Sequence, residues 1–347
     1  MRRLLVTGGA GFLGANFVRY WGARYRDDVV VVLDALTYAG DRSRLSDLEA
    51  EGRVVFVVGD VCDGELVSSL LTQYDIDTIV HFAAESHVDR SIVDGVSFVR
   101  TNVLGTQTMV DAARAAWCTN GAWRPGVRFH HVSTDEVYGP LAHDAAPFTE
   151  TSPYRPSSPY SASKAASDHL VRAGGITHGL PYTISHCANN FGPFQHPEKL
   201  IPLMITRALR GEPLTIYGDG QQRREWLSVH EHCVALDAIL GTDVAGETFC
   251  IGSGVEFVNL ELVQHLCDML DARFTADVSL RDRFPRCPAA LGASCRTLIT
   301  HVADRPGHDR RYALDSTKLA RITGVTLRRD VSAELEGLLD WMMTGGA

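Results

Sequence analysis

The chain has 347 residues, of which 45% are hydrophobic and 22% charged, and its formal net charge is -9 at pH 7. A domain commonly takes about 150 residues, so this length predicts two lobes. No apolar run approaches the ~18 residues of a membrane helix, and the composition is typical of a soluble globular protein that binds no membrane. The chain also has no basic block, which argues against a nucleic-acid partner.

The N-terminus and the cysteines indicate the compartment. The first residues, MRRLLVTGGAGF, reach glycines after three apolar residues. Such a run is too short for the apolar region of a signal peptide, so we expect a cytoplasmic protein. The eight cysteines show no C-x-x-C spacing and predict neither a disulfide framework nor a zinc or other metal site. A pairing of Cys287 with Cys295 stays open as an alternative.

Apolar runs that end in turn residues alternate with segments of helical period through the first half of the chain. The expected strands are RRLLVTGG, DDVVVVLDAL, RVVFVVGDV, DTIVHFAA, RFHHVST and YTISHCANN. The expected helices are FLGANFVRYWGARY, ELVSSLLTQYD, VSFVRTNVLGTQTMVDAARAA and SASKAASDHLVRA. Continuous Val-rich runs predict strands covered on both faces. The prediction is therefore an α/β fold, a Rossmann-type doubly wound parallel sheet.

This regularity ends at about residue 190. The segments FGPFQHPEKLIP, IYGDGQQRREW and ADRPGHDRR are rich in loop-forming, aromatic and cationic residues, as is typical of a substrate-binding lobe. We predict a first domain over residues 1–190 and a smaller C-terminal lobe over residues 191–347. Part of the chain, at about 226–250, is expected to cross back.

The segment TGGAGFLG predicts a dinucleotide site. Gly8, Gly11 and Gly14 recur at three-residue spacing after a strand and at the start of a helix, where backbone amides can approach a pyrophosphate. Asp34 lies at the end of the next strand, 20 residues beyond Gly14. A carboxylate there accepts hydrogen bonds from ribose hydroxyls and repels a 2′-phosphate, which favours NAD over NADP. The alternative is a tight turn followed by an ordinary loop aspartate.

Tyr160 and Lys164 stand four residues apart in SPYSASK, on one face of an expected helix. We expect the nearby ammonium to lower the pKa of Tyr160 and make it a base, with Thr134 as a hydroxyl partner. Such a pair alone is usually a solvated helix face. Its place downstream of a dinucleotide site indicates short-chain dehydrogenase chemistry.

Two carboxylates, Asp135 and Glu136, follow the strand RFHHVST. Within a strand they would point to opposite faces, so they can act together only if the strand ends at about Thr134. Both would then lie at the carboxyl edge of the sheet, where doubly wound folds bind ligands. Two close carboxylates resist ionising together, so one supplies an acid and the other a base. The alternative is a surface turn with two exposed acids.

At this point the chain resembles the extended short-chain dehydrogenase/reductases, and among them the nucleotide-sugar 4,6-dehydratases. The resemblance is carried in order by TGGAGFLG, LDALTYAG, HFAAESHVDRS, STDEVYG, SPYSASKAASDHL, NNFGPFQHPEKLIPL, IYGDGQQRREW and DRPGHDRRYALD. It implies catalysis by Thr134, Asp135, Glu136, Tyr160 and Lys164. It further implies that NAD contacts Gly8, Gly11, Phe12, Leu13, Gly14, Asp34, Leu36, Thr37, Asp60, Val61, Ala83, Ala84, Thr101, Tyr160, Lys164 and Asn190. A nucleotide sugar would contact Ser86, Thr134, Asn189, Lys199, Leu200, Ile216, Tyr217, Arg224, Arg305 and His308.

The chain departs from the family pattern at a few positions. Cys250 in FCIGSG stands where an Asn is common, and Glu225 and His230 in RREWLSVHEH replace more usual acids. Gly174 and Gly175 fall within an expected helix, where each glycine costs up to about 1 kcal/mol relative to Ala. None of these positions belongs to the expected catalytic set.

The resemblance implies an internal oxidation, water elimination and reduction on a nucleoside-diphosphate hexose, with dTDP-glucose first among substrates, and a homodimer formed through two helices. An NDP-sugar 4-epimerase or decarboxylase shares the glycine loop and the Tyr and Lys pair but needs no carboxylate pair. A catalytically silent dinucleotide-binding sensor needs neither the pair nor Thr134. These two classes remain the alternatives.

Overall fold

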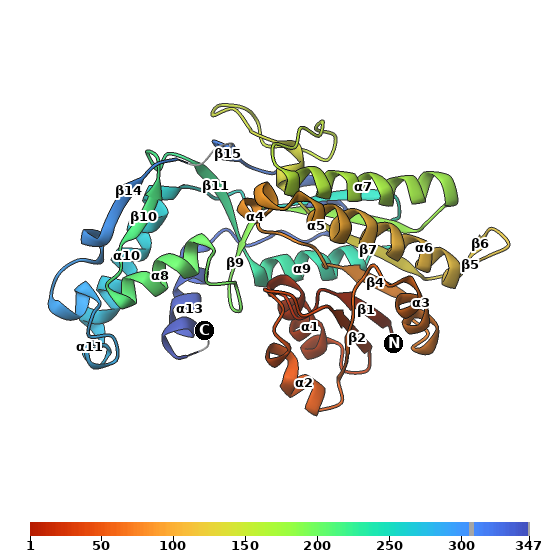
Figure 1. Ribbon diagram of the computed structural model, residues 1–347, viewed down its shortest axis with the longest axis horizontal. Helices are drawn as coiled ribbons and strands as arrows, with labels where there is room; N and C mark the ends of the chain where they lie inside the picture. The colour runs from red at the N-terminus through yellow and green to blue at the C-terminus, as the bar shows by residue number, and fades with distance from the viewer. Residues whose placement is uncertain (305–308, 346–347) are drawn as a thin grey trace.

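The structure is a computed structural model that describes residues 1–304 and 309–345. Figure 1 shows an elongated molecule with two lobes, the first built around a large sheet and the second made mostly of C-terminal elements. Among the described residues, no helix combines the length and apolar character needed to cross a bilayer.

Seven parallel strands form the central sheet, in the order β12-β8-β7-β4-β1-β2-β3. The strands are β1 (Arg3–Thr7), β2 (Val29–Asp34), β3 (Val54–Val58), β4 (Thr78–His81), β7 (Arg128–Thr134), β8 (Tyr182–Cys187) and β12 (Glu247–Ile251). Most of their residues are buried because helices cover both faces. The structure confirms the Rossmann-type doubly wound sheet that the sequence predicts.

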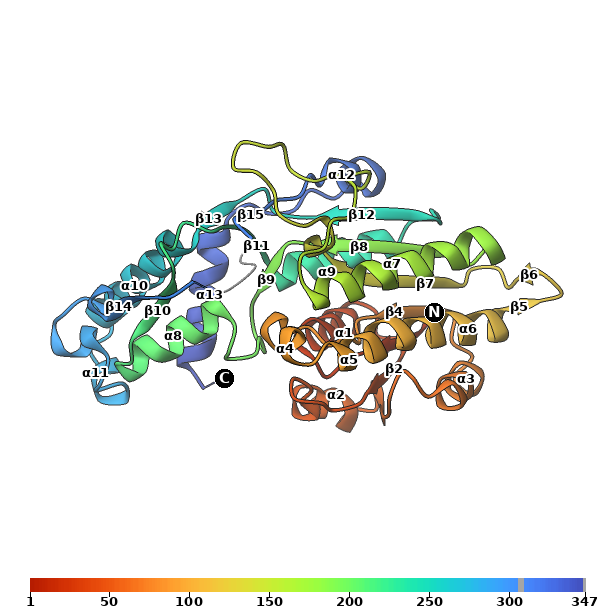
Figure 2. The same cartoon turned by 45° about the horizontal axis from the view of Figure 1, so that its top comes forward.

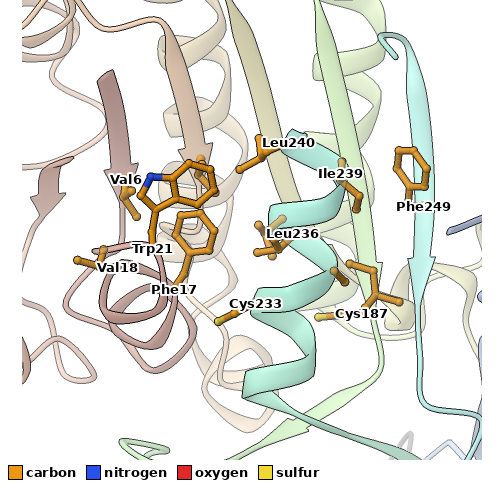
Figure 3. Close-up of a cluster of buried hydrophobic side chains, with 14 of the residues drawn as sticks. Val6, Phe17, Val18, Trp21, Cys187, Cys233, Leu236, Ile239, Leu240 and Phe249 are labelled. Atoms are coloured by element: carbon orange, nitrogen blue, oxygen red, sulfur yellow. The ribbon is translucent and has the colours of Figure 1, made fainter. Parts of the chain in front are cut away.

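Helices on the two faces of the sheet enclose two apolar cores. The first core takes side chains from α1 (Phe12–Arg24), α2 (Ser46–Ala50), α9 (Val229–Leu240) and α12 (Thr317–Thr323). Figure 3 shows part of it, where Phe17 and Trp21 of α1 face Leu236 of α9. The second core is closed by α3 (Gly64–Gln73), α6 (Gly105–Trp117) and α7 (Pro159–His178). The sheet is thus fixed from both sides.

The helix expected at 96–116 is not continuous. The chain forms α4 (Val88–Val93), α5 (Gly95–Phe98), a π-helix over Val99–Leu104 and then α6. The wider π turn places the buried Asn102 against two neighbours: its Oδ1 accepts from the backbone N of Glu85 at 2.8 Å, and its Nδ2 donates to Ser163 Oγ at 2.8 Å. These bonds tie the segment to the loop after β4 and to α7, and the wider turn is what lets Asn102 reach both.

The C-terminal lobe is built from helices and short strands around a third core. Its elements are β9 (Asn189–Phe191), α8 (Leu200–Arg210), β10 (Leu214–Tyr217), β11 (Arg223–Ser228), β13 (Glu256–Val258), α10 (Asn259–Ala276), α11 (Leu280–Arg283), β14 (Ile299–Val302), β15 (Arg311–Tyr312) and α13 (Val331–Met343). The remaining elements are a hairpin, β5 (Cys118–Thr119) with β6 (Ala122–Trp123), and 3-10 turns at Arg42–Leu45, Asp135–Tyr138, Pro288–Leu291 and Cys295–Leu298.

Figure 2 shows α12 next to β12, the edge strand of the sheet, and both lie well away from α10 and α11. The chain therefore returns to the first lobe after residue 190, although the domain boundaries themselves stay a prediction. All eight cysteines are free thiols. Cys287 and Cys295 are buried with their Sγ atoms 3.5 Å apart, which is beyond the ~2.05 Å of a disulfide bond.

Candidate active site

A cavity of about 360 Å³ opens at the carboxyl edge of the sheet, beyond the ends of β1, β2, β3, β4, β7 and β8. Most of the site residues expected from the sequence line it. They are Gly8, Gly11, Phe12, Leu13, Gly14, Asp34, Thr37, Asp60, Val61, Ala83, Ala84, Ser86, Thr101, Thr134, Asp135, Glu136, Tyr160, Lys164, Asn189, Asn190 and Lys199. The fold thus gathers segments from across the first 200 residues into one site.

The other expected residues that the structure describes lie outside the lining of this cavity. Leu36 is next to it and donates its backbone N–H to Asp34 Oδ1 at 2.8 Å. In the C-terminal lobe, Ile216 is buried and Tyr217 is exposed. Arg224 is buried, and its Nη2 donates to the backbone O of Asp309 at 2.7 Å.

Two further expected or departing positions are described, and two are not. Leu200 begins α8 and is partly buried. Arg305 and His308 lie outside the described residues. Cys250 is buried in β12 with its Sγ 3.7 Å from the Tyr138 hydroxyl, so it does not line the cavity.

The turn between β1 and α1 accepts only glycine at two positions. Gly8 has φ +68°, and a Cβ on it would lie 2.7 Å from the backbone N of Ala83. A Cβ on Gly14 would lie 2.2 Å from the carbonyl O of Gly8. No side chain caps the start of α1 at Gly11, so its first amides remain available to an anion. The backbone can therefore come close to a bound pyrophosphate.

Asp34 ends β2 at the far side of this turn. Its side chain is buried and accepts from two backbone N–H groups, Ala10 to Oδ2 at 2.9 Å and Leu36 to Oδ1 at 2.8 Å. A Cβ on Gly40 would lie 2.8 Å from Asp34 Oδ1, so the following loop also requires a small residue. The carboxylate is thereby fixed at the edge where an adenosine ribose would lie.

The strand β7 ends at Thr134, as the sequence predicts, and a 3-10 turn begins at Asp135. Thr134 Oγ1 accepts from the backbone N of Glu136 at 3.3 Å and lies 3.3 Å from Asp135 Oδ1. This cap turns the chain so that both carboxylates reach the same cavity. The alternative of two exposed acids is wrong, because Asp135 is only 3% exposed.

The environment of Asp135 favours its protonated form. Burial raises its pKa well above the usual value, and the charges of Glu136 and Glu225 raise it further, against smaller opposing effects of Arg224 and Thr134. Asp135 Oδ2 is buried without a hydrogen-bond partner among the described residues. An acid that holds its proton thus sits beside a second carboxylate, Glu136, in the same cavity, and the division of acid and base between the two stays a prediction.

Tyr160 and Lys164 enter the cavity from the first turns of α7. That helix begins with a capping box between Ser158 and Ser161 and has Pro159 in its first turn. Lys164 Nζ donates to the backbone O of Val132 at 2.8 Å. Burial lowers the pKa of Lys164 to about 8.

The expectation that Lys164 lowers the pKa of Tyr160 is wrong for the chain by itself. Burial and the nearby Glu136 raise the pKa of Tyr160, and a hydrogen bond with Thr134 opposes this only in part. The physical reason is that desolvation of the phenolate outweighs the effect of a cation whose ammonium is directed at Val132. Tyr160 therefore needs further positive charge to act as a base.

The cavity also contains residues that the sequence did not single out. Glu85, Cys187, Gln195 and His196 line it, as does Tyr38, whose ring lies under the Arg90 guanidinium at 3.9 Å. Each lies within, or directly beside, a motif that had been noted. Their position at the end of a strand, as for Cys187, or a few residues after one was the signal that could have identified them.

Comparison with known proteins adds the family. Residues 5–333 match the family model described as GDP-mannose 4,6 dehydratase. A dTDP-glucose 4,6-dehydratase of Xanthomonas campestris pv. campestris (strain B100) is 48% identical over 345 residues, which cover 99% of this chain and 94% of the relative. The dTDP-glucose 4,6-dehydratase 1 of Escherichia coli (strain K12) is 44% identical over 351 residues, covering 99% and 93%.

Solved structures show the same likeness. A dTDP-glucose 4,6-dehydratase from Streptomyces venezuelae with NAD bound superposes with a TM-score of 0.85 at 44% identity, covering 99% of this chain and 97% of that one. A dTDP-glucose 4,6-dehydratase from Bacillus anthracis in complex with NAD gives 0.84 at 36% identity, with the same coverage. A UDP-glucose 4-epimerase from Thermotoga maritima gives 0.82 at 23% identity, a likeness of fold alone.

Proposed function

The chain belongs to the GDP-mannose 4,6-dehydratase family, and on that premise we propose that it is a dTDP-glucose 4,6-dehydratase, which converts dTDP-glucose to dTDP-4-keto-6-deoxyglucose. One observation carries the proposal. Asp135 and Glu136, the two carboxylates that an elimination needs, share a cavity with Tyr160 and Lys164. Relatives with this activity align with nearly the whole chain.

The residues at the carboxyl edge fit NAD. The glycine turn leaves room for a pyrophosphate at the start of α1, and Asp34 is held where it would accept the ribose hydroxyls and repel a 2′-phosphate. Bound there, NAD supplies the hydride acceptor for carbon 4 of the sugar, the hydride donor for carbon 6, and a positive charge close to Tyr160. We assign to NAD the cofactor residues named from the sequence.

The first step depends on Tyr160 and Lys164. Tyr160 takes the proton from the hydroxyl on carbon 4, and Thr134 polarises the same oxygen. Lys164 holds the nicotinamide ribose and stabilises the phenolate. Because burial raises the pKa of Tyr160, the loss of its own proton depends on the cationic site being complete.

The elimination depends on the carboxylate pair. Oxidation at carbon 4 acidifies the hydrogen on carbon 5, which Glu136 removes. Asp135 then gives its proton to the departing hydroxyl on carbon 6. The raised pKa of Asp135 suits this role, since a group that acts as a general acid near neutral pH must still hold its proton there.

The nucleotide sugar would extend from the cavity toward the C-terminal lobe. Ser86, Asn189 and Lys199 line the cavity with Thr134, and the ammonium of Lys199 suits a diphosphate. We also assign sugar-nucleotide contacts to Leu200, Ile216, Tyr217, Arg224, Arg305 and His308.

We further propose a cytoplasmic homodimer formed through helices of the first lobe. Apolar side chains that are more than half exposed gather on α4, α5 and the π-helix, where a second copy could cover them: Ile92, Val93, Val96, Val99 and Leu104. Light scattering of the purified protein tests this, and a monomer at micromolar concentration would contradict it.

The activity is tested by incubating the protein with dTDP-glucose and, in parallel, with the UDP, GDP and ADP hexoses. We expect a product of dTDP-glucose that is lighter by one water, read by mass spectrometry. A product of unchanged mass but inverted configuration at carbon 4 would instead support the epimerase alternative. No product from any sugar nucleotide would support the silent sensor.

A further inference from the structure

The face of α7 that carries Tyr160 and Lys164 continues to a third polar residue, Asp168. The three residues are spaced by four, so they lie one above another on the helix. Asp168 is 0% exposed. It does not line the cavity and no step of the proposed reaction uses it, although a buried carboxylate is costly to maintain without a purpose or a partner.

The two oxygens of Asp168 face different neighbours. Oδ2 accepts from the Tyr154 hydroxyl at 2.8 Å and lies 2.9 Å from His186 Nε2. Oδ1 lies 3.3 Å from His131 Nε2. The Oδ2 side joins α7 to β8 and to the loop before the helix. The Oδ1 side faces β7 and, through it, the catalytic lysine.

His131 lies between this carboxylate and Lys164. Its Nε2 is 3.5 Å from Lys164 Nζ and 3.3 Å from Asp168 Oδ1. A proton on Nε2 serves the carboxylate, whereas a proton on Nδ1 leaves Nε2 free to accept from the ammonium. In either tautomer one neutral ring separates a buried cation from a buried anion. Burial lowers the pKa of His131 to about 4, so the ring itself carries no charge near neutral pH.

We propose that Asp168 is a positioning residue: acting through His131, it is the buried counter-ion that keeps Lys164 charged in the cavity that Tyr160 also lines. A buried ion whose partner is removed becomes uncompensated and tends to neutralise. Without Asp168, Lys164 would therefore lose its proton more easily, and the phenolate of Tyr160 would lose the cation that supports it. The inference deepens the proposed function and rests on it for the catalytic importance of Lys164.

Other titratable groups also interact with Lys164 and Asp168. Lys164 also interacts electrostatically with Cys187 of β8, and its charge lowers the pKa of His81 of β4 in addition to the larger effect of burial. Asp168 raises the pKa of Lys164, whereas burial lowers it. The rival explanation is that Asp168 acts only through Oδ2, by holding His186 and Tyr154 in place. The two explanations differ in what happens to Lys164.

The sequence makes a direct test practical, because the chain has only three lysines, Lys164, Lys199 and Lys318. Protein labelled with [ε-13C]lysine would give three side-chain signals, and that of Lys164 is assigned by its absence in Lys164→Met. The pKa of Lys164 is then read by NMR titration without cofactor or substrate. We expect Asp168→Asn to lower this pKa by about one unit, the lower end of the shift that a nearby opposite charge causes.

The matched control is His186→Gln, which changes the Oδ2 side and keeps a side-chain N–H that can donate to Asp168. We expect it to leave the pKa of Lys164 at the parent value. An unchanged pKa in Asp168→Asn, or an equal fall in both variants, would overturn the proposal and favour the structural role. If Asp168→Asn does not fold, Asp168→Glu replaces it; retention of the parent pKa supports the proposal and a fall contradicts it.

The parent protein offers a test that needs no variant at Asp168. A buried lysine without a counter-ion titrates near pH 5 to 6, so a measured Lys164 pKa in that range would overturn the proposal, and one near 8 supports it.

The kinetics of hydride transfer provide a further test. In a single turnover with dTDP-glucose, Asp168→Asn should lose hydride transfer at lower pH than the parent on the alkaline side, with binding of the sugar nucleotide unchanged. Absence of any turnover in the parent would refute the proposed function and leave the NMR result standing.

Discussion

Asp135 at the carboxyl edge of the large sheet and Glu225 in the C-terminal lobe are buried carboxylates that the protein holds by different means. At the edge, Asp135 follows directly after the buried strand β7, and its Oδ2 has no hydrogen-bond partner among the described residues. In the lobe, the buried Glu225 accepts from the backbone N of Gly254 at 2.6 Å and of Leu314 at 2.7 Å, and Arg311 pairs with Glu256 at 2.7 Å.

This difference separates the tasks of the two regions. Unsatisfied polar atoms on a rigid edge are available to a substrate, and their charge state is adjusted by burial. Satisfied ion pairs and backbone contacts in the lobe join segments that are remote in the chain, so they fix the shape against which the nucleotide would bind. Changes at the edge should therefore alter chemical steps, and changes in the lobe should alter stability or affinity.

The largest effect is expected from separating the two carboxylates at the edge. Asp135→Asn removes the proton for the leaving hydroxyl but keeps Glu136 as a base, so carbon 5 should still exchange its hydrogen with solvent while water loss slows. Glu136→Gln should suppress the exchange as well. Each loss should be about 100 to 10,000-fold in rate, the usual range for general acid or base assistance.

Both steps can be measured on dTDP-glucose in D2O by NMR and mass spectrometry. Binding of the sugar nucleotide to each variant, measured by calorimetry, serves as the control and should change little. If both variants eliminate water at the parent rate, the pair has no catalytic role and the epimerase alternative gains support.

The site residues at the carboxyl edge were easier to predict from the sequence than the elements of the C-terminal lobe, because the sequence signals for the edge are local. The strand end at Thr134 and the spacing of Tyr160 and Lys164 follow from neighbouring residues. In the lobe, β10 pairs with β14, 85 residues later in the chain, and a strand such as β15 has two residues. The π-helix before α6 also escaped prediction, because it depends on bonds of Asn102 to residues that are distant in sequence.

A pH-dependent loss of stability is expected from the lobe. Burial raises the pKa of Glu225 to about 7, from an ordinary value of about 4.3. A carboxyl whose folded pKa is raised contributes its full stability below the unfolded pKa and loses it as pH rises through about 7. The free energy of unfolding should therefore fall between pH 5 and pH 8, by up to about 3 kcal/mol from this group.

Urea unfolding at several pH values measures how steeply the free energy of unfolding falls with pH. This slope is the test, because Glu225→Gln also removes an acceptor and so lowers the free energy of unfolding at every pH. The slope should be shallower in Glu225→Gln than in the parent. The exposed Glu261→Gln is the control and should keep the parent slope. Equal slopes in all three proteins would show that Glu225 does not titrate in this range.

A smaller effect is expected at Asp34, on binding rather than on a chemical step. Asp34→Asn keeps a side-chain acceptor for only one of the backbone N–H groups of Ala10 and Leu36, and it loses the charge. A hydrogen bond to a charged acceptor is stronger than one to a neutral acceptor by about 1.4 kcal/mol, so NAD should bind about tenfold more weakly. The ratio between the affinities for NAD and NADP should also become smaller. Calorimetry on protein stripped of cofactor measures both affinities, and equal binding of NAD and NADP by the parent would contradict the role of Asp34.

The smallest effects, of opposite sign, are expected from one glycine in each lobe. A Cβ on Gly175 of α7 would lie 2.2 Å from Cε1 of the buried Tyr182 ring, whereas a Cβ on Gly337 of α13 meets no atom within 4 Å. Gly337→Ala should stabilise the protein by about 0.5–1 kcal/mol, because alanine loses less backbone entropy in a helix. Gly175→Ala has the same entropic advantage, but its Cβ crowds the Tyr182 ring, which costs about 1–3 kcal/mol. The net result is a loss of about 1 kcal/mol in stability. Unfolding of both variants by urea tests the pair, and stabilisation by Gly175→Ala would mean that α7 can move away from β8 without cost.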